Sequence, residues 1–501
     1  MASSDGVEGG TPHVVLVPLM APSHMIPMVG MAKLLASRGA VVSLVTTPSN
    51  AAWMEGTIQR CAGSGLAVQV IVLRFPSREV GLPEGCERLD MIPSKSMTRN
   101  FLRASEMMQE PLERRLRESR IAPSFIISDA GAAWTRALGR ALGVPRLVFH
   151  GYGCFALLCQ HNLHVQKTHL SATSESDPFV VPGLPQRVEV TRAQLPGAFS
   201  TSVDMEDIRE EIREGELSAD GFVVNTFVEL EPSYVSALEE TTGKKVWTIG
   251  PLSLCDRESP YETEGEDKAS NEASLCVRWL DSMKRGSVVY ASFGSLARLP
   301  PSQLVEVGLG LEASGQPFIW AIKTRGEEAS REFESWLGDE GFEERNKGRG
   351  FLIRGWAPQV VILSHPAVGG FLTHCGWNST LESVCAGVPM AAWPLFSEQF
   401  LNERLVVEIL GIAVAIGVKS PTIWGEEEKA GVQVTREEVA RALVNLTDVG
   451  KDAKERRRRA RNLAKAARRA VEDGGSSLTN LDLLLRTVTQ EMSPKNAVVV
   501  K

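Results

Sequence analysis

The chain of 501 residues is long enough for two or three domains with large hydrophobic cores. Its composition is 43% hydrophobic and 23% charged, and its net charge of −7 argues against nucleic acid and anionic membranes as main partners. The eight cysteines form no C-x-x-C pattern, and no segment has the ~18 apolar residues of a transmembrane helix or the features of a secretory signal. These observations favour a soluble cytoplasmic protein.

The first periodic segment predicts a βαβ unit and therefore a fold of the α/β class. Residues 13–19 are almost continuously apolar, which is typical of a strand buried on both faces. Apolar residues after Pro27 recur at helical spacing until Gly39, and residues 41–45 predict the next buried strand. The loop after the first strand contains His24, at the carboxyl edge where open α/β sheets bind ligands.

A second candidate for this edge is Asp129, which ends the apolar strand predicted at residues 125–129. Residues 133–142 then predict a helix, and residues 144–149 predict a strand. Because a carboxylate can polarise a histidine into a general base near neutral pH, His24 and Asp129 predict a catalytic pair. The alternatives are a loop histidine without a catalytic role and an aspartate that caps a helix.

Residues 75–105 and 150–215 show no regular period. Their scattered apolar side chains predict loops over a pocket for a flat organic molecule, although they could equally pack only within their own loops. Cys159 and the three histidines within residues 161–169 match no standard zinc spacing, which favours a helix with ordinary histidines. The candidate contacts for the pocket's ligand are His24, Met91, Phe155, Phe199 and Phe396.

Two further predicted strands, residues 223–227 and 246–249, precede a stretch rich in Glu, Asp, Ser and Gly. That change in composition predicts a linker over residues 253–275. It separates an N-terminal domain, residues 1–252, from a C-terminal domain, residues 276–475.

The C-terminal domain repeats the alternation of strands and helices. Residues 287–292, 318–322 and 351–354 predict strands, and Pro301 begins a helix. The acidic stretch 326–349 predicts a solvated excursion between two of these strands.

The most informative segment of the chain predicts a strand, a tight turn and a helix. A short apolar strand ends at His374, and Gly376 precedes a helix with periodic apolar residues. The first turn of such a helix binds anions through unpaired N–H groups and its dipole. His374 can donate to a phosphate, and Trp356 offers a flat face to a base. Ser379 and Glu382 could instead form a capping box, and Trp356 could be a core residue.

Three helical features follow. Thr435 and Glu438 have the spacing of a capping box, and residues 451–471 predict the next helix. The basic run 456–459 could bind nucleic acid, but an apolar stripe at helical spacing favours a solvated helix face. Residues 478–492 predict the last helix.

The 44 residues 356–399 resemble, without a gap, the signature box of plant secondary-product glycosyltransferases, which use UDP-sugars and have the GT-B fold. The resemblance implies two Rossmann-like domains that face one cleft, with a C-terminal helix, in residues 476–501, that returns to the N-terminal domain. It implies that uracil and ribose contact Trp356, Ala357, Gln359 and Glu382, that the diphosphate contacts Ser295, His374, Asn378 and Ser379, and that the sugar contacts Trp377, Glu398 and Gln399.

The loop at residues 18–27 resembles the family's first-loop motif, whose histidine is the catalytic base, and residues 127–129 resemble the strand end whose aspartate orients it. The departure is Pro22-Ser23, where the family often has Gln-Gly. By this resemblance, a hydroxyl deprotonated by His24 attacks the sugar and UDP leaves, with inversion to a β-glucoside. A final glutamine in the box is typical of enzymes that prefer UDP-glucose.

The nearest subgroup acts on flavonoids, brassinosteroids, sapogenins and cytokinins, so we expect a small lipophilic plant metabolite as acceptor. The alternatives are another UDP-sugar, an acceptor that already carries a sugar, a UDP-sugar hydrolase or epimerase, and a non-catalytic sensor of nucleotide sugars. The chain contains no D-x-D sequence, so we expect no metal and no other cofactor. We also expect a monomer that binds no nucleic acid and does not insert stably into membranes.

Overall fold

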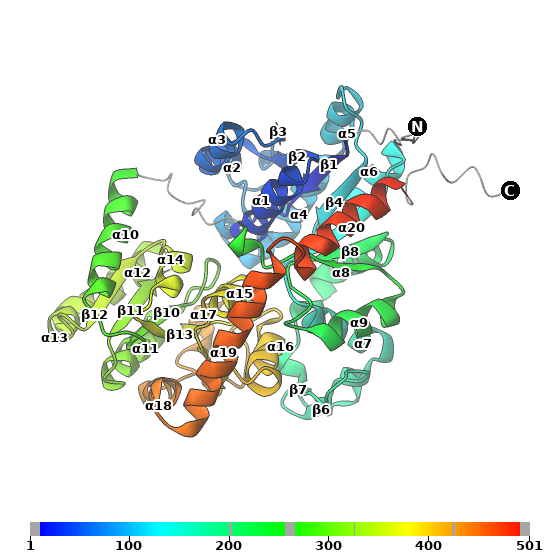
Figure 1. Ribbon diagram of the computed structural model, residues 1–501. Coiled ribbons are helices and arrows are strands. Elements are labelled where there is room, and N and C mark those ends of the chain that lie inside the picture. Colours follow the sequence, from blue (N-terminus) through cyan, green and yellow to red (C-terminus); the bar gives the residue numbers. More distant parts are fainter. Residues whose placement is uncertain (1–10, 200–202, 256–265, 325, 423–425, 491–501) are drawn as a thin grey trace, which may run out of the picture.

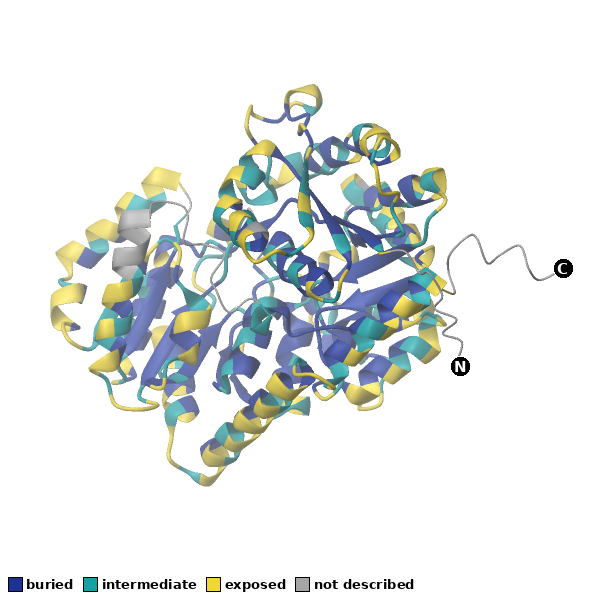
Figure 2. Ribbon diagram, turned by 45° about the horizontal axis from the view of Figure 1, so that its top comes forward, coloured by how far each residue is buried: buried dark blue, intermediate teal, exposed yellow. Residues whose placement is uncertain are grey.

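The computed structural model describes residues 11–199, 203–255, 266–324, 326–422 and 426–490. Each of its two domains is built on a parallel β-sheet flanked by helices (Figure 1). The strands at the centre of both sheets are buried, as Figure 2 shows, because helices exclude water from both faces. This arrangement confirms the predicted α/β class with two Rossmann-like domains.

Within the described residues, the N-terminal domain has a seven-stranded parallel sheet in the order β3-β2-β1-β4-β5-β8-β9. Strand β1 pairs with β4, with Val17 opposite Ser128, so the turn after β1 and the end of β4 lie at the same edge. The strands are β1 His13–Val17, β2 Val41–Thr46, β3 Val68–Val72, β4 Phe125–Asp129, β5 Arg146–His150, β8 Gly221–Val224 and β9 Val246–Thr248.

The helices of this domain include several in the segments predicted to be irregular. Helix α7 is buried on several faces, so its sequence lacks the polar stripe that marks a surface helix. A short hairpin, β6 Pro178–Val180 and β7 Glu189–Thr191, lies in the same region. The helices are α1 Pro22–Ser37, α2 Pro48–Trp53, α3 Glu55–Gly63, α4 Thr98–Glu106, α5 Gln109–Arg117, α6 Thr135–Leu142, α7 Cys154–Gln166, α8 Glu206–Leu217 and α9 Pro232–Thr242.

The C-terminal domain has, among the described residues, a six-stranded parallel sheet in the order β12-β11-β10-β13-β14-β15. The strands are β10 Val288–Ser292, β11 Phe318–Ile322, β12 Gly350–Arg354, β13 Val368–Thr373, β14 Met390–Ala392 and β15 Ala413–Ala415. The helices are α10 Glu266–Asp281, α11 Pro301–Ala313, α12 Gly326–Asp339, α13 Phe342–Arg345, α14 Gln359–Ser364, α15 Trp377–Ala386, α16 Gln399–Arg404, α17 Glu427–Ala430, α18 Arg436–Thr447, α19 Lys451–Ala470 and α20 Ser476–Gln490.

One prediction for this domain is wrong. The acidic stretch 326–349 is not a solvated excursion, because α12 and α13 bury Phe333 and Phe342 against Trp320 while their acidic residues face water. The predicted linker, residues 253–275, is partly helical because α10 begins at Glu266. Residues 256–265 of that linker lie outside the described part of the chain.

The last helix returns to the N-terminal domain, as predicted. From the end of α19, the chain continues into α20, which runs along the N-terminal domain (Figure 1) and contacts β9. Asn480 Nδ2 donates to Thr248 Oγ1 at 2.8 Å, and Ser477 Oγ donates to the carbonyl of Gly250. The predicted capping box of Thr435 and Glu438 is also present, at the start of α18. No helix in the described ranges is long and apolar enough to cross a membrane.

Candidate active site

A cavity of about 340 Å³ lies between the two domains, a volume within the range of small-molecule sites. Its N-terminal wall comes from the first half of α1 and from the segments that follow β5, β8 and β9. Its C-terminal wall comes from the segments that follow β10, β11, β12, β13 and β14. Of the predicted site residues, the cavity is lined by His24, Ser295, Trp356, Ala357, Gln359, His374, Trp377, Asn378, Ser379, Glu382, Phe396, Glu398 and Gln399.

The predicted catalytic pair forms on the N-terminal wall. His24 lies in the first turn of α1, after the buried strand β1, and Asp129 is the last residue of β4. His24 Nδ1 lies 2.7 Å from Asp129 Oδ2, and the main-chain N–H of Gly131 donates to the other carboxylate oxygen at 2.9 Å. The Asp129 side chain is 3% exposed, whereas that of His24 is 31% exposed. The carboxylate is therefore fixed behind the imidazole, whose other nitrogen is left for a ligand.

Burial lowers the pKa of His24, but neighbouring carboxylates outweigh this effect. The charge of Asp129, its hydrogen bond and the charge of Glu398 together raise the pKa of His24 above its ordinary value of 6.5. A histidine with a pKa near neutral can accept a proton at physiological pH and release it again. The geometry of the pair, with the negative charge of Asp129 beside the imidazole, therefore suits His24 to act as a general base.

His374 lies on the opposite wall, packed between two glycines. A Cβ at Gly294 would lie 2.5 Å from His374 Cε1, and a Cβ at Gly376 would lie 2.4 Å from His374 Nε2. Gly294 also has a φ of +81°, which other residues rarely adopt. Burial, with the nearby charge of Lys323, lowers the pKa of His374 to about 4, so the ring is neutral. Its buried Nδ1 has no hydrogen-bond partner within the described residues.

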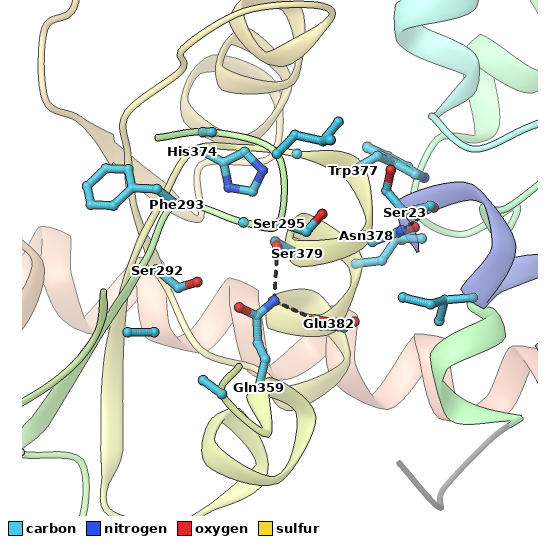
Figure 3. Close-up of a pocket in the computed structure, with 18 of the residues that line it drawn as sticks. Ser23, Ser292, Phe293, Ser295, Gln359, His374, Trp377, Asn378, Ser379 and Glu382 are labelled. Atoms are coloured by element: carbon cyan, nitrogen blue, oxygen red, sulfur yellow. Dashed lines mark hydrogen bonds between the residues drawn. The ribbon is translucent and has the colours of Figure 1, made fainter. Parts of the chain in front are cut away.

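The capping interpretation of Ser379 and Glu382 is wrong. The N-cap of α15 is Gly376, three residues before Ser379, so the serine lies too far into the helix to cap it. Instead, Gln359 Nε2 donates to Ser379 Oγ at 2.9 Å and to Glu382 Oε2 at 2.6 Å (Figure 3). Burial raises the pKa of Glu382 to about 7, while this hydrogen bond lowers it. These side chains form a polar network in the cavity that Trp356, a residue 44% exposed, also lines.

The first turn of α15 contacts the N-terminal domain directly. Trp377 Nε1 donates to the carbonyl of Asn225 at 2.7 Å, and Asn378 Nδ2 donates to the carbonyl of Ser23 at 2.8 Å. The resemblance assigned these two side chains to the sugar and the diphosphate. In this structure, their polar groups join the two domains at the edge of the cavity.

The end of the signature segment forms a second turn at the cavity. Gln399 Oε1 accepts from the main-chain N–H groups of Leu395 and Phe396, at 2.9 and 3.1 Å. Glu398 accepts from Ser397 Oγ at 2.6 Å and from Asn402 Nδ2 at 3.3 Å. Both side chains are thus held in place by their own turn while they line the cavity.

Three of the predicted acceptor contacts do not line this cavity. Phe155 is fully buried, with its ring edge-on to Tyr234, and is a core residue. Phe199 stacks on His164 with ring centroids 4.3 Å apart, and Met91 is 40% exposed outside the cavity. Apolar composition alone could not distinguish residues that face a ligand from residues that pack their own segment.

The histidines of the segment 161–169 take part in ordinary packing. His164 lies on α7, as the helical interpretation predicted, and His169 meets the same phenylalanine edge-on. No three His, Cys, Asp or Glu side chains gather as a metal ion requires anywhere in the described ranges.

Tyr152 and Lys323 are among the polar residues of the cavity that were not predicted from the sequence. Tyr152 follows β5 on the N-terminal wall, and Lys323 follows β11 on the C-terminal wall. Their position in the sequence could have identified them, because each lies just after a buried parallel strand, where ligands bind in such sheets. The same signal had identified Asp129.

Comparisons with known proteins agree with this architecture. The family described as "UDP-glucoronosyl and UDP-glucosyl transferase" matches residues 266–436. UDP-glycosyltransferase 73D1 of Arabidopsis thaliana is 49% identical over 96% of this chain and 97% of its own. UDP-glycosyltransferase 73C11 of Barbarea vulgaris is 46% identical over 97% of this chain and 98% of its own.

Solved structures give the same result. UGT73P12 of Glycyrrhiza uralensis, complexed with glycyrrhetinic acid 3-O-monoglucuronide, is 35% identical, with a TM-score of 0.85 over 96% of each chain. UGT2 of Phytolacca americana, complexed with UDP-2fluoro-glucose and pterostilbene, is 27% identical, with a TM-score of 0.74 over 96% of this chain and 100% of that one.

The fold and its interdomain cleft are those of a GT-B glycosyltransferase. The chain belongs to the plant family 1 UDP-glycosyltransferases, in the UGT73 group, and is a UDP-glycosyltransferase that acts on small plant metabolites.

Proposed function

We propose that this enzyme transfers glucose from UDP-glucose to a hydroxyl group of a small lipophilic plant metabolite, with inversion, to give a β-glucoside. One observation carries the proposal. His24, with Asp129 bonded behind it, lines one wall of the cavity, and Trp356 and the N-terminus of α15 line the other. A base and a nucleotide-sugar site therefore share a single space.

The reaction is a single displacement. His24 Nε2 takes the proton of the acceptor hydroxyl while the hydroxyl oxygen attacks the anomeric carbon from the face opposite the diphosphate. The bond between that carbon and the phosphate oxygen breaks, and UDP leaves. Asp129 holds the proton on Nδ1 and stabilises the imidazolium that forms. Such a base contributes about 10²–10⁴-fold to the rate.

The C-terminal wall supplies the donor contacts. Trp356 stacks on uracil, and the network of Gln359 and Glu382 receives the ribose hydroxyls. The leaving diphosphate is stabilised by the N–H groups at the start of α15, by Ser295 and by the neutral ring of His374, which donates one hydrogen bond. The hexose meets the turn that carries Glu398 and Gln399, with Trp377 beside it.

We propose that no divalent metal takes part. The chain has no D-x-D sequence, and the helix N-terminus already offers positive potential to the diphosphate. Glucoside formation should therefore be equal in the presence of EDTA and of added Mg²⁺. A rate that EDTA abolishes and Mg²⁺ restores would contradict this part of the proposal.

The acceptors that we propose are flavonoids and steroid or triterpenoid sapogenins. The acceptor side of the cavity is partly apolar, with Ile26, Leu252 and Phe396 among its lining residues, and such walls suit lipophilic rings. Support also comes from two relatives, because UGT2 was solved with pterostilbene and UGT73P12 with a 3-O-monoglucuronide. The molecule bound to UGT73P12 already carries a sugar, so monoglycosides are also candidate acceptors. Other UDP-sugars are also candidate donors.

The test is incubation with UDP-glucose and a panel of flavonoid, sapogenin and monoglycoside acceptors. Mass spectrometry should detect addition of one hexose to at least one class, and proton NMR should show the large anomeric coupling of a β-glucoside. An α-linked product would contradict inversion. Release of free glucose at the rate of UDP release, or conversion of UDP-glucose to an epimer without glucoside, would establish a hydrolase or an epimerase instead.

A further inference from the structure

Lys323 is a cationic side chain in the cavity with no role in the function proposed above. It follows β11 directly, is half-buried, and lines the cavity beside Trp356. Its ammonium lies 4.7 Å from the centroid of the Trp356 ring. Among the residues that the structure describes, no carboxylate forms an ion pair with it. A partly desolvated ammonium without a counter-ion is unfavourable unless a ligand supplies the negative charge.

The sheet topology places Lys323 between the two ends of the nucleotide site. The neighbouring strands run β12-β11-β10-β13, and all are parallel, so their carboxyl ends form one edge. The cavity residues that follow these strands are, in that order, Trp356, Lys323, Ser295 and His374. A nucleotide with its base at Trp356 and its diphosphate at Ser295 and His374 must therefore extend past the ammonium of Lys323.

The charged groups near Lys323 leave it available to an anion. Arg298 lies close enough to lower its pKa, but donates to the carbonyls of Ser295 and Ala297, at 2.7 and 2.8 Å. Asp90, on the opposite domain, raises the pKa but is paired with Arg88 at 3.3 Å. Burial is the largest effect, and the pKa of Lys323 falls to about 8.

We propose that Lys323 is a binding residue for the diphosphate of the donor, and that its ammonium leaves the Trp356 ring to pair with a phosphate oxygen when the nucleotide binds. The inference rests on the proposed function only in placing the nucleotide between Trp356 and His374. The other contacts proposed for the diphosphate are Ser295, the neutral ring of His374 and a helix N-terminus, so Lys323 supplies the formal positive charge that they lack.

Binding measurements with uridine, UMP and UDP at pH 7 show whether Lys323 contacts the phosphates or only supports the ring of Trp356. Lys323→Met should weaken UDP binding about tenfold or more and leave uridine binding unchanged, because only the phosphates lose a partner. Lys323→Arg should keep most of the UDP affinity. An equal loss for uridine and UDP, or no loss for UDP, would overturn the proposal.

Lys244→Met is a matched control, since Lys244 also lies over an aromatic ring, that of Phe222 at 6.0 Å, but outside the cavity. It should bind UDP like the wild type.

The pH dependence gives a second readout. UDP affinity of the wild type should fall as the pH rises above about 8, because Lys323 loses its proton there, whereas an arginine stays charged. A change shared by the wild type and Lys323→Arg belongs to other groups, such as the Glu382 carboxyl with its pKa of about 7. Identical profiles above pH 8 would contradict the inference.

Failure of this inference is distinguishable from failure of the proposed function. If the wild type binds no UDP, the nucleotide site itself is wrong. If the wild type binds UDP and forms glucoside while Lys323→Met binds UDP equally well, only the role of Lys323 is wrong.

Discussion

Asn378 Nδ2 donates a hydrogen bond of 2.8 Å to the main-chain carbonyl of Ser23, the residue before His24. Asn378 lies in the first turn of α15, whose N-terminus faces the donor site. The helix that we propose for the diphosphate therefore also contacts the turn that carries His24. Figure 3 shows the two residues meeting across the domain boundary.

Asn378→Ala should lower kcat by roughly ten- to a hundredfold, because a displacement of the base by about 1 Å costs that much. Steady-state kinetics together with UDP binding measure the effect. Ser23→Ala is the matched control, since it keeps the main-chain carbonyl and should stay within a few-fold of the wild type. A loss confined to UDP affinity would show that Asn378 holds the donor and does not position the base.

Asp129→Asn should lower kcat on the order of 10³–10⁴-fold, because the amide no longer fixes the tautomer or stabilises the imidazolium. The pH dependence of kcat/KM shows the direction in which the pKa of His24 changes. In the wild type, kcat/KM should fall as the pH drops through the pKa of His24, which lies above 6.5. Without the charge of Asp129 this fall should move to lower pH. An unchanged profile would contradict the pairing.

Gly376→Ala should weaken UDP binding about tenfold or more, because its Cβ would lie 2.4 Å from His374 Nε2 and must displace the ring. Isothermal titration with UDP measures the loss. Gly338→Ala, on α12 with no atom within 4 Å of its added Cβ, should bind UDP normally. Equal affinities for the two variants would show that the position of His374 is unimportant.

Trp356→Ala should weaken UDP binding by about ten- to a hundredfold, since stacking of a base on an aromatic ring is worth about 1–3 kcal/mol. The Michaelis constant for the acceptor, measured at saturating donor, should change much less. A larger effect on the acceptor than on UDP would move the tryptophan to the other half of the site.

Phe155→Ala and Phe396→Ala should have opposite consequences. The first removes a fully buried ring and should destabilise the protein by about 3–5 kcal/mol without changing the choice of acceptor. The second removes a ring that lines the cavity and should raise the Michaelis constant for the acceptor with little loss of stability. Thermal unfolding and kinetics with several acceptors decide between them. Altered selectivity in Phe155→Ala would restore that residue as an acceptor contact.

Much of the fold was predictable because buried parallel strands have a strong local signal. The continuous apolar runs that became β1, β4, β10 and β13 gave both the sheets and the edge at which polar residues gather. The pairing of His24 with Asp129 could be predicted in the same way, since His24 follows β1 and Asp129 ends the neighbouring strand β4.

The remaining errors arose where tertiary packing overrides local pattern. The acidic residues of 326–349 suggested solvent exposure, yet a few aromatic side chains suffice to bury one face of α12. Glu382 has capping-box spacing from Ser379, but the helix begins three residues earlier, so both side chains turn to Gln359. Lys323 was missed because a single lysine after a strand looks like an ordinary surface residue until its neighbours are known.

The proposed mechanism depends most on His24 as the base that takes the proton of the acceptor hydroxyl. The most direct test compares His24→Ala with the wild type in glucoside formation and in UDP binding. We predict that UDP affinity is unchanged while turnover falls by about 10²–10⁴-fold. Turnover within a few-fold of the wild type, with UDP binding intact, would contradict the assignment of the base and with it the proposed mechanism.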